Sequence, residues 1–166
     1  MKKALESPRV ARTKGPYVQG VALTAGTLLF TSGVVARNAQ GKLIGIGDIE
    51  IQTRQCLTNI GNIIAAAGGS LQDLAKITVF LRDLRDYAGM NAVRNEMLAG
   101  IPFASSTVQA ALNAPAALIE IEAVACVGGN ESPATPPVKV TKADKTKVAA
   151  TSAKAKEKEK TVQRRR

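Results

Sequence analysis

The alternating segment Ile119-Glu120-Ile121-Glu122-Ala123-Val124 constrains the fold more than any other part of this sequence. Successive side chains of a β-strand point to opposite faces of the sheet, so Glu120 and Glu122 share one face and Ile119 and Ile121 share the other. The apolar face needs a covering layer. The carboxylate face is either solvated or lines a cleft at a contact between subunits, and the strand by itself allows both.

Turn signals and hydrophobic periodicity predict the other elements of the body. In chain order they are a β-hairpin over 19–33, a helix over 48–67, a strand over 76–81, a helix over 86–98, and strands over 105–110 and 119–126. Two helices set against one face of a mixed sheet make an α+β domain.

Both predicted helices begin at an aspartate. Asp48 is a suitable N-cap for the first helix, which Gly68-Gly69 should end, and Asp86 is a suitable N-cap for the second. The residues expected on the buried face of the first helix are Ile49, Cys56, Leu57, Ile60, Ile64 and Ala67. Those expected on one side of the second are Tyr87, Met90, Met97 and Leu98.

The positive charge of the chain is concentrated in a C-terminal segment. Residues 128–166 account for +7 of the formal net charge of +10, and residues 1–127 account for +3. The segment has no aromatic and almost no large aliphatic residue, so burial cannot offset the entropy of ordering it. We therefore expect a domain over 1–127 and a disordered basic tail over 128–166, through which nucleic acid could bind by phosphate contacts.

The chemistry available to the domain is limited because the chain contains no histidine. Catalytic triads that need histidine and His-ligated zinc sites are excluded. Cys56 and Cys126 have no metal-type spacing and are expected to be buried thiols. No metal or cofactor is expected. There is no apolar run of about 18 residues and no hydrophobic stretch after the first lysines, so the expected location is cytoplasmic.

Several segments, in order and almost without gaps from about Ser7 to Cys126, together resemble the RidA (YjgF) family of enamine/imine deaminases. They are Gly15-Pro16-Tyr17-Val18-Gln19-Gly20, Phe30-Thr31-Ser32-Gly33, Thr78-Val79-Phe80-Leu81-Arg82-Asp83-Leu84, Met90-Asn91 and Ile119-Glu120-Ile121-Glu122-Ala123-Val124-Ala125. The resemblance implies a chorismate-mutase-like fold, a homotrimer whose uncovered sheet faces pack together, and clefts between subunits. It also implies cofactor-free hydrolysis of 2-imino acids to 2-oxo acids and ammonia.

The resemblance also assigns site residues. Glu120 matches the carboxylate that positions or activates the attacking water, and Tyr17 and Ser32 match its catalytic neighbours. The positions matched to substrate binding are Gly33, Asn91, Ser105 and Thr107. The departure is at Ser105, where typical members have an arginine that holds the substrate carboxylate through two parallel hydrogen bonds. A neutral hydroxyl cannot replace that guanidinium.

The missing arginine leaves three functions open. The chain is a hydrolase for a substrate without the usual carboxylate, a non-catalytic binding or assembly trimer, or a protein that binds RNA through its tail. In a variant of the first, Arg12, Lys14 or Arg94 supplies a displaced cation; otherwise all three are ordinary surface charges.

Overall fold

The computed structural model describes residues 2–11, 15 and 17–128 of the 166-residue chain. Of the predicted tail over 128–166, only Gly128 belongs to the described residues. The predicted disorder of the tail and the predicted binding of nucleic acid through it therefore lie outside the described residues, as do Arg12 and Lys14.

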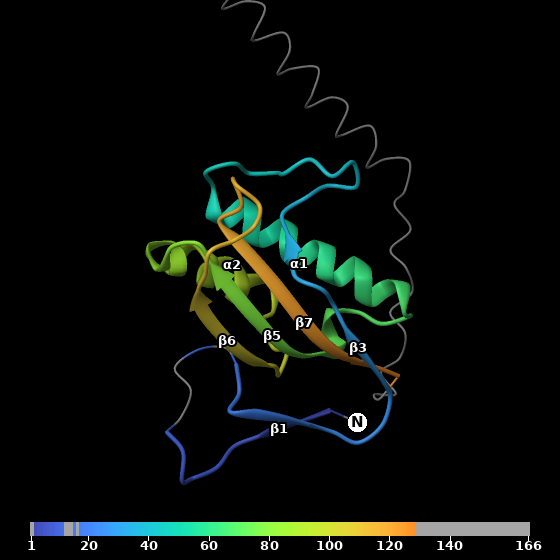
Figure 1. The fold of residues 1–166 in the computed structure, drawn as a ribbon. Helices are drawn as coiled ribbons and strands as arrows, with labels where there is room; N and C mark the ends of the chain where they lie inside the picture. The colour runs from blue at the N-terminus through green and yellow to red at the C-terminus, as the bar shows by residue number, and fades with distance from the viewer. Residues whose placement is uncertain (1, 12–14, 16, 129–166) are drawn as a thin grey trace, which may run out of the picture. The chain divides into compact units, whose positions relative to one another are not determined.

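A mixed five-stranded sheet forms the centre of the described chain (Figure 1). Its main path runs from β3 (Thr27–Phe30) through β7 (Ile119–Val127) and β5 (Leu74–Leu81) to β6 (Ala104–Gln109). The short strand β4 (Val34–Val35) also pairs with β7. Only β5 and β6 run parallel, and every other pairing in this sheet is antiparallel.

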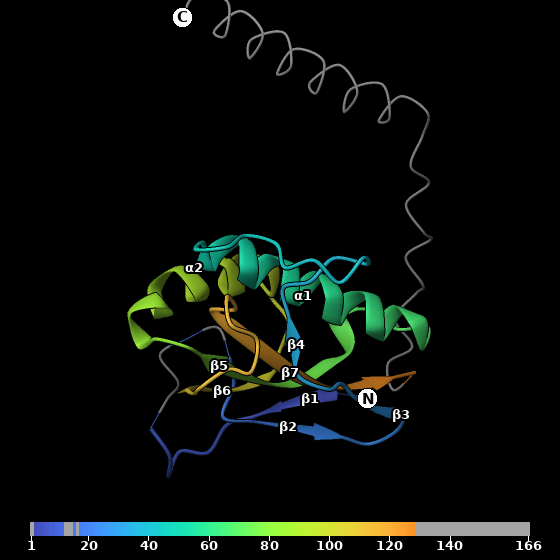
Figure 2. The same ribbon diagram turned by 45° about the horizontal axis from the view of Figure 1, so that its top comes forward.

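Two helices, α1 (Ile49–Ala66) and α2 (Tyr87–Met97), cover one face of this sheet (Figure 2). Two 3₁₀ turns, Leu71–Asp73 and Leu84–Asp86, come directly before β5 and α2. The prediction of an α+β domain with both helices on one face is confirmed.

Strand β7 has the alternation that its sequence predicts. Ile119 and Ile121 are buried against the helical layer, whereas Glu122 is exposed and Glu120 is half-buried. Because β7 pairs with β3, β4 and β5, its alternation fixes which face of the neighbouring strands is apolar. The core between sheet and helices is aliphatic apart from Phe103, in keeping with the low aromatic content.

Helix α1 begins and ends where the sequence predicts. The Asp48 carboxylate accepts a hydrogen bond of 3.0 Å from the Ile51 N–H. At the other end Gly68 has a φ of +82°, and the Gly69 N–H donates to the Ile64 carbonyl at 3.1 Å. Cys56, Leu57, Ile60 and Ile64 are buried as expected. Ala67 is exposed instead, because the helix has already ended at Ala66.

The predicted cap of the second helix is wrong. Asp86 makes no side-chain cap hydrogen bond, because the chain enters α2 from the turn Leu84–Asp86 and Asp86 is already helical in conformation. Asp83 caps that turn in its place, accepting from the Arg85 N–H at 2.8 Å. Tyr87 at the start of α2 is 39% exposed, so it does not join the buried side of the helix.

The predicted N-terminal hairpin is also wrong. Strand β2 (Gly20–Leu23) pairs with β1 (Lys2–Leu5), and β3 pairs with β7. Strand β7 is nine residues long, and its last four positions provide an antiparallel partner for all of β3. Local turn chemistry could not reveal this pairing, which joins residues almost 100 positions apart.

Both cysteines are buried thiols, as predicted. Within the described part of the chain, no helix is both long enough and apolar enough to span a membrane.

Gly61 in the middle of α1 offers a test of this packing. A Cβ at that position would meet Leu71 at 3.4 Å, which is ordinary van der Waals contact. We expect Gly61→Ala to raise the free energy of unfolding by about 0.5–1 kcal/mol, since alanine loses less backbone entropy in a helix. Urea denaturation measures the change. Gly68→Ala is the control and should destabilise the protein, because φ at Gly68 is +82°; stabilisation by both would contradict the cap geometry.

Candidate functional site

Three of the predicted site residues meet around Arg94. Helix α2 places Asn91 and Arg94 about one turn apart, and the Arg94 Nη2 group donates to the Asn91 Oδ1 atom at 2.5 Å. The Nη1 group donates to the Ser105 hydroxyl on β6 at 3.0 Å. The guanidinium carbon lies 5.3 Å from the centre of the Tyr17 ring, a cation–π contact.

Backbone geometry brings Tyr17 to this group. The Val18 N–H donates to the carbonyl of Phe103 at 3.0 Å, which ties the segment after Tyr17 to the residues just before β6. A side chain at Gly15 would collide with the Tyr17 ring, so glycine there gives the ring its space. Tyr17 is therefore held beside the start of β6, where Ser105 lies.

Arg94 is not a surface charge. It is 2% exposed, and its Nε group has no hydrogen-bond partner. The acceptors that it does contact, Asn91 and Ser105, are neutral. Its place in the apolar stripe of α2, beside Met90 and Val93, is the sequence signal that could have indicated burial.

Glu120 belongs to a second group, at the loop that follows β3. If Gly33 carried a Cβ atom, that atom would collide with the Glu120 carboxylate, lying 2.8 Å from its Cδ atom. Register pairs Glu120 with Val35 on one side and Phe80 on the other. The absence of a side chain at Gly33 therefore allows the carboxylate to pack against this loop.

The Glu120 carboxylate also influences a buried thiol. Burial raises the pKa of the Cys56 thiol to about 12, and the negative charge of Glu120 contributes in the same direction. The thiol therefore stays protonated at neutral pH, and Cys56 acts as an apolar residue of the core rather than as a nucleophile.

The two groups lie on opposite faces of the sheet. Ser105 is in register with Ile77, and Ile77 with Ala123, both of which are buried beneath the helices. Glu120, three residues along β7 from Ala123, projects from the other face. Ser105 and Glu120 are two strands apart across the sheet and three residues apart along the strand direction. Their backbones are therefore about 14 Å apart. The structure of one chain therefore does not bring all the predicted residues together.

Two predicted residues stand apart from these contacts. Ser32 is exposed beside Gly33, and Thr107 is half-buried on β6 in register with Val79. Among the described residues, neither side chain is hydrogen-bonded to Arg94 or Glu120.

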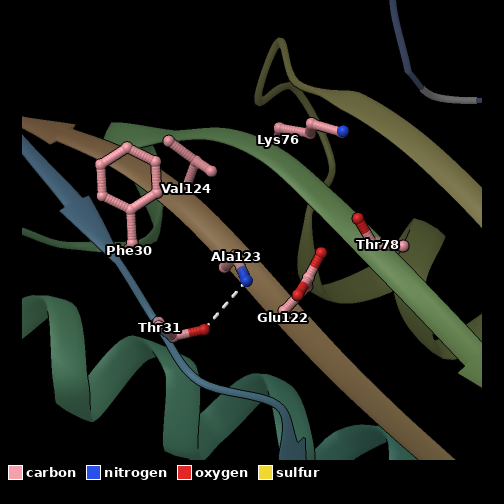
Figure 3. Close-up of a pocket in the computed structure, with 7 residues that line it drawn as sticks. All are labelled: Phe30, Thr31, Lys76, Thr78, Glu122, Ala123 and Val124. Carbon is pink, nitrogen blue, oxygen red and sulfur yellow. Dashed lines mark hydrogen bonds between the residues drawn. The ribbon is translucent and has the colours of Figure 1, made fainter.

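The sheet face opposite the helices carries a shallow cavity of about 110 Å³. Figure 3 shows its lining side chains: Lys76 and Thr78 on β5, Glu122 and Val124 on the neighbouring β7, and Phe30 on β3. The Ala123 N–H donates to the Thr31 hydroxyl at 2.9 Å (Figure 3). The cavity is lined by none of the predicted catalytic residues, so it marks the uncovered sheet face rather than the predicted site. Among the described residues, no cluster of three or more potential metal ligands is found.

The fold is that of a small α+β domain with two helices on one face of a mixed sheet. The Glu120 carboxylate lies on one face of this sheet, and the Arg94 group lies on the other. The chain belongs to the RidA family: residues 8–127 match the family model described as Endoribonuclease L-PSP.

Relatives of known sequence cover the same region. A RutC family protein of Pyrococcus horikoshii is 40% identical over 125 residues, which are 75% of this chain and 98% of the relative. TdcF of Escherichia coli K12, named as a reactive intermediate deaminase, is 40% identical over 129 residues, with 75% of this chain and 97% of TdcF covered.

Solved structures agree with this assignment. The Rid family protein YyfB of Yersinia pestis superposes with a TM-score of 0.69 at 27% identity, covering 76% of this chain and 98% of its own. E. coli TdcF, solved with bound serine, has a TM-score of 0.55 at 38% identity, with 75% and 98% covered.

The Cys56 environment gives a chemical test of the core. With a pKa of about 12, on the order of one thiol in 10³ is ionised at pH 8.5, and only the thiolate reacts. We expect iodoacetamide at pH 8.5 to leave Cys56 unmodified in the native protein and to alkylate it in urea, as read by peptide mass spectrometry. Rapid native alkylation would contradict a core position for this thiol.

Proposed function

We propose that this chain hydrolyses small imines or enamines, in clefts formed between the subunits of a homotrimer. The reaction adds water to the carbon of a C=N bond, and collapse of the resulting carbinolamine gives a carbonyl compound and ammonia. Family membership, and the deaminase name of a relative at 40% identity, support this reaction class.

The observation that carries the proposal is the packing of the Glu120 carboxylate against Gly33. Imine hydrolysis needs a water molecule beside an electrophilic carbon and a proton for the departing nitrogen. One partly desolvated carboxylate can serve both steps, first accepting a proton from water and then returning it to nitrogen. Glu120 is half-buried and adjoins the exposed Ser32, so it is the carboxylate best suited to this role.

The separation of the two groups supports the proposed subunit assembly. Glu120 and the Arg94 group lie on opposite faces of one sheet, with about 14 Å between the backbones of Glu120 and Ser105. A second copy of the chain can bring its own group to the first. A cleft between subunits would then combine Glu120 and Ser32 of one chain with Tyr17, Asn91 and Ser105 of another, and the uncovered sheet faces would form the centre of the trimer.

The first test is a coupled assay. An amino-acid oxidase generates 2-imino acids in situ, and semicarbazide traps the imine that is not hydrolysed. We expect the wild type to suppress trapping and Glu120→Gln to lose this effect by about 10²-fold or more, because the general base is removed. Glu122→Gln is the matched control, since Glu122 is an exposed carboxylate on the same face of the same strand.

Equal activity of wild type and Glu120→Gln would remove Glu120 from the mechanism. An inert wild type that still binds small carboxylic acids would favour the alternative of a non-catalytic binding trimer. Ser105, at the position where the resemblance implies an arginine, supports that alternative.

A second variant tests the position of the carboxylate without removing it. Gly33→Ala would place a methyl group where the Glu120 side chain now lies, and the flexible end of that side chain would move. We expect a stability change below about 1 kcal/mol, together with a loss of hydrolysis close to that of Glu120→Gln. In Gly20→Ala, the new methyl meets only ordinary contacts, at 3.7 Å from Leu5, and activity should persist. Full activity of Gly33→Ala would contradict the proposed packing.

A further inference from the structure

Arg94 is a buried cation with no anionic partner among the described residues. Two of its five N–H groups donate, one to an amide oxygen and one to a hydroxyl, and the Nε group has no acceptor. The salt bridges of the described chain join Arg54 to Glu96 and Arg85 to Asp83, so Arg94 is in neither. Burying an ionised group without an opposite charge is costly.

Arg82 shows how this fold satisfies a structural arginine. Its guanidinium donates to the carbonyls of Ala117, Ala114 and Leu112, and so it fixes the loop before β7. Arg94 has no such set of carbonyls. A purely structural role would not require a full charge at 2% exposure with one N–H unsatisfied.

We propose that Arg94 binds the carboxylate of the ligand. The inference rests on the proposed function for the kind of ligand, and it adds to that function the residue of this chain that would hold the acid group, an arginine on α2 rather than one on β6. A carboxylate would supply the missing negative charge and accept two parallel N–H bonds, one of them from Nε.

The geometry leaves one edge of the guanidinium for this contact. The Tyr17 ring lies over the guanidinium, and Asn91 and Ser105 take one N–H from each terminal nitrogen. The edge of the guanidinium that contains Nε has no acceptor at Nε, and a carboxylate could approach this edge in the plane of the guanidinium. Because Arg94 is buried, a neighbour has to move. Tyr17 is the residue expected to move, since it lies in a loop whereas Asn91 and Ser105 lie on α2 and β6.

Ser105 has a defined role in this arrangement. Its hydroxyl accepts from Arg94, so a helix residue now brings a guanidinium to the strand position where the resemblance expects an arginine. A second arginine at position 105 would place two cations in contact. Ser105→Arg alone should therefore be unfavourable, whereas Ser105→Arg combined with Arg94→Met should be tolerated.

The test compares butanoate with butanamide, which differ in charge but hardly in shape. In NMR titrations of the full-length wild type, butanoate should bind about 10-fold to 100-fold more tightly than butanamide, because hydrogen bonds to a charged partner are the stronger ones. Equal affinities would overturn the proposal without any variant being needed.

Variants then assign the charge to Arg94. Arg94→Met should remove the preference for butanoate, and Arg94→Lys should retain part of it. Adding Ser105→Arg to Arg94→Met should restore it. The control Arg54→Met removes an exposed arginine that is paired with Glu96 and should leave binding unchanged. Circular dichroism and size-exclusion chromatography check that each variant folds and assembles as the wild type does.

The outcomes separate this inference from the proposed function. Arg94-dependent butanoate binding without imine hydrolysis would support the inference and contradict the enzyme. Hydrolysis that needs Glu120 but is unchanged in Arg94→Met would support the enzyme and overturn the inference. Failure of butanoate to bind, with Arg94→Met dissociating the assembly, would indicate that a neighbouring subunit supplies the anion and would also overturn it.

Discussion

The alternation along β7 is the constraint on which the rest of this structure depends. Nine residues of one strand pair with three others, so the direction of each β7 side chain fixes the apolar face of the whole sheet. Ile119, Ile121 and Ala123 turn toward the helices and form the floor of the core. The same alternation turns Glu120 and Glu122 outward. Core formation and the position of a candidate catalytic carboxylate on the opposite face are thus consequences of one pattern.

The two polar groups of the site follow from different physical requirements. At Gly33 the absence of a side chain leaves space for the Glu120 carboxylate to pack against a loop, so the position of this carboxylate depends on steric fit. The position of the Arg94 guanidinium depends instead on its hydrogen bonds to Asn91 on α2 and Ser105 on β6, and the Tyr17 ring lies beside it. Because the groups face opposite sides of the sheet, folding of one chain does not bring them together, and the proposed function requires a second subunit to do so.

The absence of an arginine at position 105, where the resemblance implies one in typical members, has a different meaning once the position of Arg94 is known. In the sequence it indicates loss of the group that would hold a carboxylate. In the structure the Ser105 hydroxyl touches another guanidinium, which comes from α2. A guanidinium therefore lies beside position 105 although it comes from a different element of the fold. Comparing residues position by position cannot reveal this contact, because Arg94 and Ser105 are 11 positions apart in the sequence.

The sequence by itself determined the elements whose signals are local: the alternation of β7, the helix α1 between Asp48 and Gly68, and the two-layer α+β class. It also pointed to Tyr17, Asn91 and Glu120 as site residues, through the resemblance. Only the tertiary structure decided that β3 pairs with β7 rather than with β2, that Asp83 caps in place of Asp86, and that Arg94 is buried beside Ser105. Those features depend on contacts between residues distant in the chain or on the way a turn enters a helix, and neither local propensity nor periodicity contains that information.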